Sequence, residues 1–435
     1  MHATERLADF VAGYKEGLLP SSARDTAALL VTDLIAAAAA GSSGSLSVAA
    51  RAASEELYGP GGACVWLTGK SSSIAGAAMA NAAAASALDI DDGHRGAAGH
   101  PGAGIIPAVL AVGQSIGARD ASMIDAIALG YDVALRVATS RPLATIETYC
   151  SGRWVGFGVA AAAGRLLGLD ASQLAHALAI AGAEAPVMLP RSKFGSSVKE
   201  GIPAAVVAGL TAAVRARAGA TGPIDLLDDD ALFSQDTLLS GLGQTWWLEQ
   251  CYLKPYACCR YMHAAVDAIL ALREPGKPII DLCIDTFPQG LRLSNARAPA
   301  TLEGGQYSYY FSCAVAALYG EEALQPVDPA HLLDPGVLEL AGRISLGAHE
   351  DFAASFPAGT PCRVTLDQGD GPKTMTVLQA LGDVGNPMSR AQVQQKFRRI
   401  TAQVLSPQKQ DALLTALDGL LVDGFKPLFA ALDGH

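Results

Sequence analysis

The chain has 435 residues, of which 50% are hydrophobic and 17% are charged, a length that permits two or three domains around a large core. Its formal net charge is −11 and no run of Lys or Arg occurs, which excludes a typical nucleic-acid-binding protein with a basic face. The negative charge also repels anions, so any anion site has to be built locally from a few cationic groups.

The N-terminal residues mix charged with apolar side chains and lack the uninterrupted apolar core of a signal peptide. The apolar run after Asp33 consists mainly of Ala and ends at residues 41–44, short of the roughly 20 apolar residues that span a bilayer. The eight cysteines form no C-x-x-C pair, so we expect reduced thiols that mostly fill the core. These features predict a cytoplasmic protein without a membrane partner.

Up to about residue 270 the sequence predicts one helix after another. Asp170 is a candidate N-cap with Gln173 three residues later, and apolar residues follow at helical spacing. The segments 156–168 and 204–218 are rich in Gly and Ala, which is typical of buried helices that pack closely.

The pattern changes after residues 274–276. Apolar and polar residues alternate over residues 280–285, which is the period of a half-buried strand. Residues 363–366 and 373–378 flank a turn segment rich in Gly and Asp, and they predict a hairpin.

Helices return at the C-terminal end, where Ser389 and Gln392 form a capping box. The helical stripe that follows consists of Val393, Phe397, Ile400 and Val404. We therefore predict a mainly α protein with a smaller α+β domain. Residues 1–270 and 389–435 form a large, bundle-like helical domain, and residues 271–388 form an inserted α+β lid.

Three acids and two histidines gather in one loop, at Asp89, Asp91, Asp92, His94 and His100. Asp and His together can perform general acid/base chemistry. A solvated loop with helix caps and a metal site are the alternatives. The spacing matches no standard metal signature, so we expect no metal. The G-H-P-G-A-G segment that follows lacks the G-x-G-x-x-G of a dinucleotide site.

A second candidate segment contains Lys199, which precedes a helix that Pro203 would help to begin. A cation beside the N–H groups of a helix N-terminus can bind an anion. An ordinary surface lysine is the alternative.

A third segment spans residues 254–263. On a helix that begins near residue 258, Arg260 and His263 share one face at i and i+3. Arg can bind a carboxylate through two hydrogen bonds, and His can add another donor. Asp267 continues that face and could instead pair with both.

These three segments, in this order, resemble the 2-methylcitrate dehydratase (MmgE/PrpD) family. The family's D-x-D-D-x-H…H-P-G loop matches residues 89–102, and V-K-E-G-I matches residues 198–202. The motif K-P-Y-x-x-C-R-x-x-H-A-A-x-D-A matches residues 254–268. Residues 351–359 and 385–398 resemble the family's lid segment and closing helix, so the resemblance covers nearly the whole chain.

The resemblance implies a large helical domain, a smaller α+β lid, a homodimer and no cofactor. It places Asp89, His100 and Lys199 at active-site positions, and Arg260 and His263 in the carboxylate-binding segment. Activities in the family include dehydration of 2-methylcitrate, decarboxylation of cis-aconitate and epimerisation of iminodisuccinate, all next to a carboxylate.

Three departures from the family pattern indicate an altered pocket. Gly93 stands where many relatives have Thr, and residues 149–153, which end in Arg153, replace H-x-T-G-T. Phe311 stands where Q-F-S-x-x-Y relatives carry an active-site Tyr, with Tyr310 adjacent to it. The substrate therefore cannot be copied from the best-known members.

We predict a cofactor-free, metal-free lyase of the dehydratase type that acts on a small di- or tricarboxylate such as 2-methylcitrate. The predicted catalytic residues are Asp89, His94, His100 and Lys199. The predicted substrate-binding residues are Asp92, Arg260, His263 and Tyr310. His100 or Asp89 would remove a proton α to a carboxylate, and a protonated His94 or Lys199 would assist departure of hydroxide. An epimerase or decarboxylase with the same groups is one alternative, and a non-catalytic polycarboxylate-binding protein is another.

Overall fold

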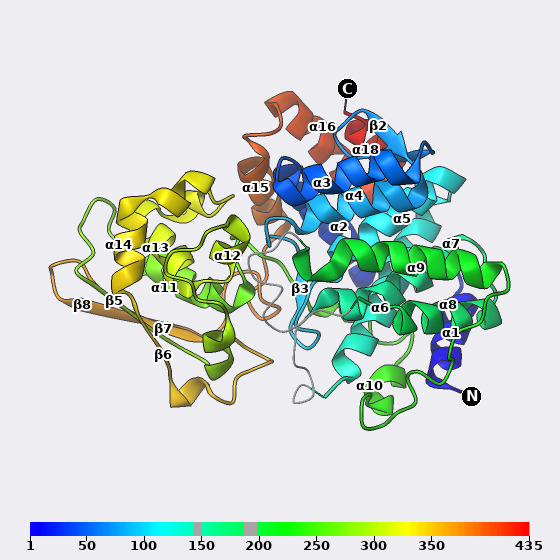
Figure 1. Ribbon diagram of the computed structural model, residues 1–435, viewed down its shortest axis with the longest axis horizontal. Coiled ribbons are helices and arrows are strands. Elements are labelled where there is room, and N and C mark those ends of the chain that lie inside the picture. The colour runs from blue at the N-terminus through cyan, green and yellow to red at the C-terminus, as the bar shows by residue number, and fades with distance from the viewer. Residues whose placement is uncertain (143–149, 187–197, 435) are drawn as a thin grey trace.

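The computed structural model describes residues 1–142, 150–186 and 198–434. Most helices gather in one helical body, and a sheet with its own helices forms a smaller layer beside it (Figure 1). The chain is therefore mainly α with a smaller α+β part, as the sequence predicts. We call residues 263–388 the sheet layer.

The first part of the helical body is built from helices that mostly bury small side chains. Their bounds are α1 Ala3–Gly13, α2 Ser21–Gly41, α3 Ser45–Ala53, α4 Ile74–Ser86, α5 Gly102–Ile116, α6 Asp120–Ser140, α7 Val155–Leu166, α8 Ala171–Ala183, α9 Ile202–Arg217 and α10 Gln235–Leu239. Asp170 caps α8 in a capping box with Gln173, and the two Gly/Ala-rich segments become α7 and α9, as predicted. A Cβ atom on Gly158 would lie 2.4 Å from the carbonyl oxygen of Gly130, so α6 and α7 pack closely because both carry glycine there.

The body is completed by the C-terminal helices, with bounds α15 Arg390–Thr401, α16 Pro407–Asp418, α17 Leu420–Asp423 and α18 Lys426–Leu432. Helices α15, α16 and α17 pack on α2, and Figure 1 shows them beside the N-terminal helices. Ser389 caps α15 as predicted, and Val393, Phe397 and Ile400 are buried. The prediction for Val404 is wrong, because α15 ends at Thr401 and Val404 is 38% exposed.

A buried ion pair ties α15 to the rest of the body. Lys396 Nζ lies 2.6 Å from Asp33 Oδ1 on α2, and it donates to the carbonyl of Ile90 at 2.7 Å. Ile90 follows Asp89 directly, so the last part of the chain helps to hold the acidic loop. Removing one partner of such a pair would leave a buried charge without compensation.

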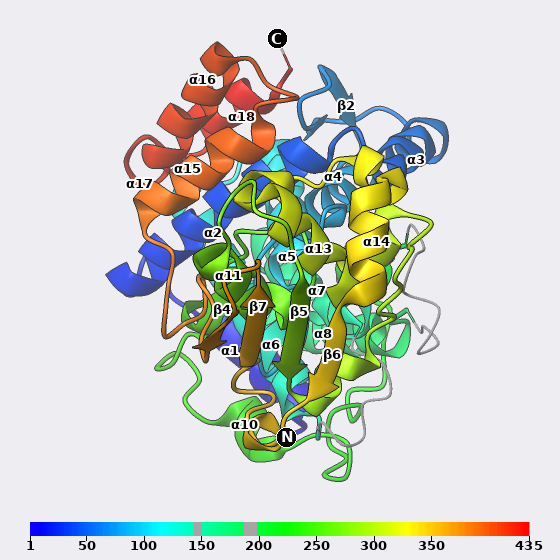
Figure 2. The ribbon, with the colours of Figure 1, turned by 90° about the vertical axis from the view of Figure 1, so that its left-hand side faces the viewer.

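The sheet layer contains one sheet with strand order β6-β5-β7-β8. The helices and strands of this layer are α11 His263–Leu272, β5 Asp281–Thr286, α12 Leu302–Gln306, α13 Tyr309–Tyr319, α14 Pro335–Arg343, β6 Ser345–Ala348, β7 Cys362–Asp367 and β8 Pro372–Val377. Strands β7 and β8 form the predicted hairpin, and β5 pairs parallel with β6 and antiparallel with β7. Figure 2 shows these strands in front of the body. Helix α11, predicted as the last helix of the body, packs on β7 and β8.

Small strand pairs lie inside the helical body, where β1 (Ala63–Val65) pairs with β2 (Lys70–Ser72). All eight cysteines lie in the described ranges and none of them forms a disulfide bond, as expected. Within the described ranges no single helix is both long and apolar enough to cross a membrane. Only the pair Ser21–Gly41 and Ser45–Tyr58, bent by 93°, reaches that length and composition together.

Candidate active site

The acidic loop lies where the helical body meets the sheet layer (Figure 1). Its strand β3 (Gly93–His94) pairs with β4 (Cys251–Tyr252), which directly precedes the segment with Lys254. At its other end the Gly102 N–H of α5 donates to Asp92 Oδ1 at 3.1 Å. The loop is therefore held on one side by a strand that is distant in sequence and on the other by the first residue of α5.

Asp89 is the centre of a buried charge cluster. Lys199 Nζ contacts Asp89 Oδ1, and Lys254 Nζ lies 3.0 Å from Asp89 Oδ2. His100 Nε2 lies 3.5 Å from Asp89 Oδ1, and His100 Nδ1 lies 3.3 Å from Asp91 Oδ2. All five side chains are buried, so their charges interact with little screening by water. We call these five residues the Asp89 cluster.

Three further side chains extend this cluster. Lys199 Nζ donates to Tyr307 Oη at 3.1 Å, and Tyr307 Oη donates to Glu200 Oε1 at 3.5 Å. Glu200 Oε2 accepts from the N–H and the hydroxyl of Ser151 at 3.1 and 2.7 Å. The His100 N–H donates to Ser151 Oγ at 2.9 Å, so these contacts connect Lys199 back to His100.

The backbone is strained where it carries these side chains. Asp89, Lys199 and Glu200 have φ of 53°, 37° and 57°, and they are three of the six non-glycine residues with positive φ in the part of the chain that the structure describes. Each such residue costs on the order of 1–3 kcal/mol and persists only where its surroundings enforce it. Lys199 lies in the short turn that directly precedes α9. Pro203 lies in the first turn of α9, so Lys199 stands just before a helix that Pro203 helps to begin, as predicted.

Opposite charges outweigh burial in setting the protonation of the cluster. Burial raises the pKa of Asp89, but the charges of Lys199 and Lys254 lower it by more, so the pKa lies well below its usual value. Burial lowers the pKa of His100, but Asp91 and then Asp89 raise it above its ordinary value. Burial also lowers the pKa of Lys199, and Asp89 raises it. Around neutral pH the site therefore holds ionised carboxylates beside cationic nitrogens.

The geometry of His100 singles out one ring nitrogen for proton transfer. Nδ1 lies 2.8 Å from the carbonyl oxygen of Asp92, which can only accept, so Nδ1 carries a hydrogen. Nε2 faces Asp89 and is the atom that can lose or gain a proton. Asp91 beside Nδ1 stabilises the protonated ring, which makes His100 a stronger base once it is neutral.

Several buried polar atoms of the cluster have no hydrogen-bond partner among the described residues. These atoms are Asp89 Oδ2, both carboxylate oxygens of Asp91, and Lys254 Nζ. Lys254 interacts with Asp89 through charge at 3.0 Å without a well-directed hydrogen bond. Since buried polar groups are normally paired, this remaining capacity points to a polar ligand.

A cation is the first alternative to an anionic ligand. Asp89, Asp91 and His100 hold their potential ligand atoms within 4.8 Å of one another, as a metal site would. Both oxygens of Asp89, however, already face the ammonium groups of Lys199 and Lys254. Their charge opposes a metal ion in the same place, so these residues suit an anion better than a cation.

Asp92 and His94 lie in the acidic loop but make separate contacts. Asp92 Oδ2 accepts from Tyr131 Oη at 3.0 Å, and burial, helped by the charge of Asp91, raises its pKa to about 7. His94 Nδ1 accepts from the Ala97 N–H at 3.2 Å, and burial lowers its pKa to about 4. A cationic His94 is therefore unfavourable near neutral pH, and the predicted roles of both residues stay predictions.

Arg260 is bound by the protein itself. The prediction that it lies on the same α-helix as His263 is wrong, because α11 begins at His263 and Arg260 lies in a 3-10 turn before it. Arg260 Nη1 donates to the carbonyls of Leu253 and Leu381 at 3.2 and 2.8 Å, and Nη2 lies 2.9 Å from Asp383 Oδ1. We call Arg260, Asp383 and these carbonyls the Arg260 clasp.

His263 belongs to the clasp rather than to the Asp89 cluster. Its Nδ1 accepts from Arg260 Nη1 at 3.2 Å, and its Nε2 donates to the carbonyl of Cys258 at 3.1 Å. The alternative partner Asp267 instead accepts from Tyr256 Oη and from the Leu381 N–H. The structure thus brings Asp89, His100 and Lys199 together, while substrate binding by Arg260 and His263 stays a prediction.

The remaining predicted positions lie around the clasp and α13. Tyr310 is half-buried with the Arg297 guanidinium 3.8 Å from its ring centroid, and Phe311 is fully buried. A Cβ atom on Gly93 would lie 2.4 Å from Tyr252 Oη, so this tyrosine fills the space beside Gly93 where the family pattern has Thr. Tyr149 lies outside the described residues.

Sequence reasoning gave no specific role to four residues of the site, namely Asp91, Glu200, Lys254 and Tyr307, although it placed Asp91 in the acidic loop. Asp91, Glu200 and Lys254 stand inside the matched motifs, so weighing each charged motif position equally would have included them. For Tyr307 the sequence carries no such signal, because only the fold brings this residue, at the end of α12, into contact with Lys199.

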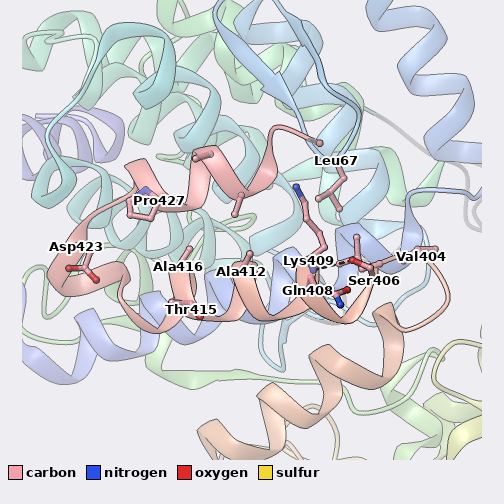
Figure 3. A pocket seen from close by; sticks show the side chains of 14 residues that line it. Leu67, Val404, Ser406, Gln408, Lys409, Ala412, Thr415, Ala416, Asp423 and Pro427 are labelled. Atoms are coloured by element: carbon pink, nitrogen blue, oxygen red, sulfur yellow. Dashed lines mark hydrogen bonds between the residues drawn. The ribbon is translucent and has the colours of Figure 1, made fainter.

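A groove away from this site differs in character. It has a volume of about 900 Å³ and opens between α16, α18 and Leu67 (Figure 3). Its lining is mostly small or apolar, and Lys409 and Asp423 lie toward opposite ends of it. None of the unpartnered buried polar atoms of the described chain lines this groove, so it shows no comparable set of converging charges.

Comparison with known proteins identifies a family for this chain. The model of the MmgE/PrpD N-terminal domain matches residues 5–241, and that of the MmgE/PrpD C-terminal domain matches residues 256–419. A protein named cis-aconitate decarboxylase from Aspergillus terreus is 25% identical over 446 residues, covering 92% of this chain and 90% of the relative. The cis-aconitate decarboxylase-like protein oryM from Aspergillus oryzae is 23% identical over 448 residues, covering 94% and 92%.

Proposed function

The chain belongs to the MmgE/PrpD family, and from that premise we propose that it is a cofactor-free lyase of the dehydratase type acting on a small di- or tricarboxylate such as 2-methylcitrate. The observation that carries this proposal is the Asp89 cluster. It sets two buried ammonium groups and one transferable histidine proton around a single carboxylate. Cationic groups of this kind suit a carboxylate substrate and the negative charge that develops next to it.

Lys199 and Lys254 hold the substrate in this proposal. Lys254 Nζ lacks a hydrogen bond within the described chain, so a substrate carboxylate can accept from it without breaking one. Lys199 reaches the same place and is fixed by Tyr307. Each well-placed donor to the enolate-like charge stabilises the transition state by on the order of 3 kcal/mol.

Proton transfer is assigned to His100. In its neutral form, Nε2 removes the proton from the carbon next to the carboxylate, and the electron pair of the broken C–H bond enters the enolate. The C–O bond to the hydroxyl group then breaks, and Lys199 supplies the proton with which water leaves. Asp89 is the second possible base, and Asp91 stabilises the imidazolium that forms.

Decarboxylation is a second candidate, favoured by the names of the relatives from Aspergillus. The same groups would serve it: the bond to a carboxylate carbon breaks, CO₂ leaves, and the carbanion takes its proton from His100. An epimerase would return the proton to the opposite face of the same carbon. These reactions differ in products and not in the residues they require.

Incubating the purified protein in D₂O with 2-methylcitrate, citrate, cis-aconitate, tartrate and aspartate-derived acids, followed by NMR, tests the proposal. A dehydratase forms an alkene, a decarboxylase releases CO₂ and incorporates deuterium into the product, and an epimerase exchanges and inverts one carbon. Lys199→Met should lower any of these rates by about 10²–10³-fold. A wild-type protein that binds one of these acids without exchanging any proton would be a binding protein, which contradicts the proposal.

A further inference from the structure

A second cavity lies between the helical body and the sheet layer, and it shares no residue with the Asp89 cluster. Its volume is about 450 Å³, within the usual range of small-molecule sites. The body contributes His94, Thr139 and Trp247 to its walls, and the sheet layer contributes residues 357–358, 379 and 383–385. We call this cavity the interlayer pocket.

The strongest sign of a ligand in the interlayer pocket is His94. This side chain is only 3% exposed, and its Nδ1 accepts from the Ala97 N–H, so the hydrogen of the neutral ring sits on Nε2. Burial lowers the pKa of His94 to about 4, which keeps the ring neutral. Nε2 has no partner among the described residues. A buried N–H donor in a pocket wall calls for a ligand with an acceptor oxygen.

The charges around the pocket favour an anion. Arg95 donates through Nε and Nη2 to Asp383 Oδ1 at 3.1 and 2.6 Å, and Arg260 Nη2 lies 2.9 Å from the same oxygen. Two guanidinium groups thus share one carboxylate, which leaves an excess of one positive charge. Arg95 Nη1 makes no hydrogen bond to the described residues and can bind a further oxygen.

The rest of the lining is apolar. The Trp247 ring lies 5.7 Å from the His94 ring, and Pro357, Ala358 and Val384 close the side of the sheet layer. We propose that the interlayer pocket binds a small monocarboxylate with an apolar or aromatic body. Its carboxylate meets His94 and Arg95, and its body packs on Trp247. A ligand held by both layers stabilises their contact beside the acidic loop, whatever reaction the Asp89 cluster performs.

Titration of the whole protein with phenylacetate, followed by tryptophan fluorescence and calorimetry, tests this site. We expect saturable binding, and the uncharged analogue phenylacetamide should bind about tenfold more weakly because it loses the charged hydrogen bonds. Trp247→Phe should remove the fluorescence change, while calorimetry still detects binding. Absence of saturable phenylacetate binding to the wild-type protein would overturn the proposal.

Matched variants locate the binding. His94→Leu removes the donor and His94→Gln retains an N–H, so the Kd should rise about tenfold in the first and less in the second. Ala358 is exposed at the rim, so Ala358→Leu fills the pocket without disturbing buried contacts, and it should weaken binding even if His94→Leu fails to fold. His100→Ala should leave the Kd unchanged. Binding that Ala358→Leu does not alter, or that His100→Ala abolishes, would overturn the proposal.

Discussion

The Asp89 cluster and the Arg260 clasp are built from the same kinds of side chain, but these side chains differ in how many of their hydrogen bonds the protein itself satisfies. In the clasp, the Arg260 nitrogens Nη1 and Nη2 are taken up by backbone carbonyls and Asp383, and only its Nε lacks a hydrogen bond among the described residues. In the cluster, Lys254 Nζ and both oxygens of Asp91 keep hydrogen-bonding capacity among the described residues. Both regions are buried, so burial does not separate them.

The difference shows how to tell a binding cation from a structural one. A buried cation whose donors are filled by the protein's own carbonyls has little left for a ligand, and its removal leaves those carbonyls unpaired. A buried cation that is paired by charge alone can exchange its carboxylate for that of a substrate. On this criterion we propose the Asp89 cluster as the site of chemistry and the Arg260 clasp as a contact that joins the layers.

The largest expected effect separates the two regions by catalysis. His100→Ala should lower solvent-deuterium exchange into a bound polycarboxylate by about 10²–10⁴-fold, because it removes the transferable proton at Nε2. Arg260→Ala should reduce exchange per folded molecule far less. Calorimetry on His100→Ala serves as the control, since binding through Lys199 and Lys254 should persist. Equal losses of deuterium exchange in His100→Ala and Arg260→Ala would contradict the separation of a catalytic cluster from a structural clasp.

The next effect is on stability. Arg260→Ala should lower the free energy of unfolding by about 3–5 kcal/mol in urea denaturation, because it leaves Asp383 buried with one fewer partner. Arg215→Ala is the matched control, since its pair with Glu184 is 49% exposed on both sides and should cost about 0–1 kcal/mol. If Arg260→Ala unfolds like the wild type but binds substrate more weakly, Arg260 belongs to the substrate site.

A comparable effect, spread over a range of pH, concerns Asp92, a loop acid whose oxygens accept hydrogen bonds from Gly102 and Tyr131. Its folded pKa of about 7 lies above the ordinary 3.8, so the folded state keeps a proton that the unfolded state releases. This contribution to stability is complete below pH 3.8 and is lost as the pH rises to about 7, at about 1.4 kcal/mol per unit.

Asp92→Asn removes this titration and keeps an acceptor for Gly102. The difference in unfolding free energy between the wild type and Asp92→Asn should therefore shift in favour of the variant as the pH rises from 4 to about 7. A difference that is constant with pH would mean that Asp92 is ionised in the folded protein, as a member of the Asp89 cluster would be.

The smallest expected effect is that of metal removal. Exchange and turnover should be unchanged after prolonged EDTA treatment, because both oxygens of Asp89 face ammonium groups rather than a metal ion. Activity that EDTA abolishes and a divalent ion restores would assign Asp89, Asp91 and His100 to a metal site and separate the cluster from the lysines.

The sequence was sufficient to predict the elements that depend on local patterns. The capping boxes at Asp170 and Ser389 and the β7–β8 hairpin follow from spacing of a few residues, and the structure confirms them. The prediction that Val404 is buried is wrong, because the helix ends about one turn before the apolar spacing indicates. The motifs also contained Asp89, His100 and Lys199, which the fold brings together although Lys199 is 110 residues from Asp89.

Only the tertiary structure decided which of the predicted cations are left free to act. The spacing of Arg260 and His263 is compatible with carboxylate binding, but Arg260 Nη1 is filled by the carbonyl of Leu381, 121 residues away. Likewise His94 and His100 look alike in the loop, and their surroundings shift their pKa values in opposite directions. A motif determines which groups are present, whereas partners that only folding supplies determine their charge and their remaining hydrogen-bonding capacity.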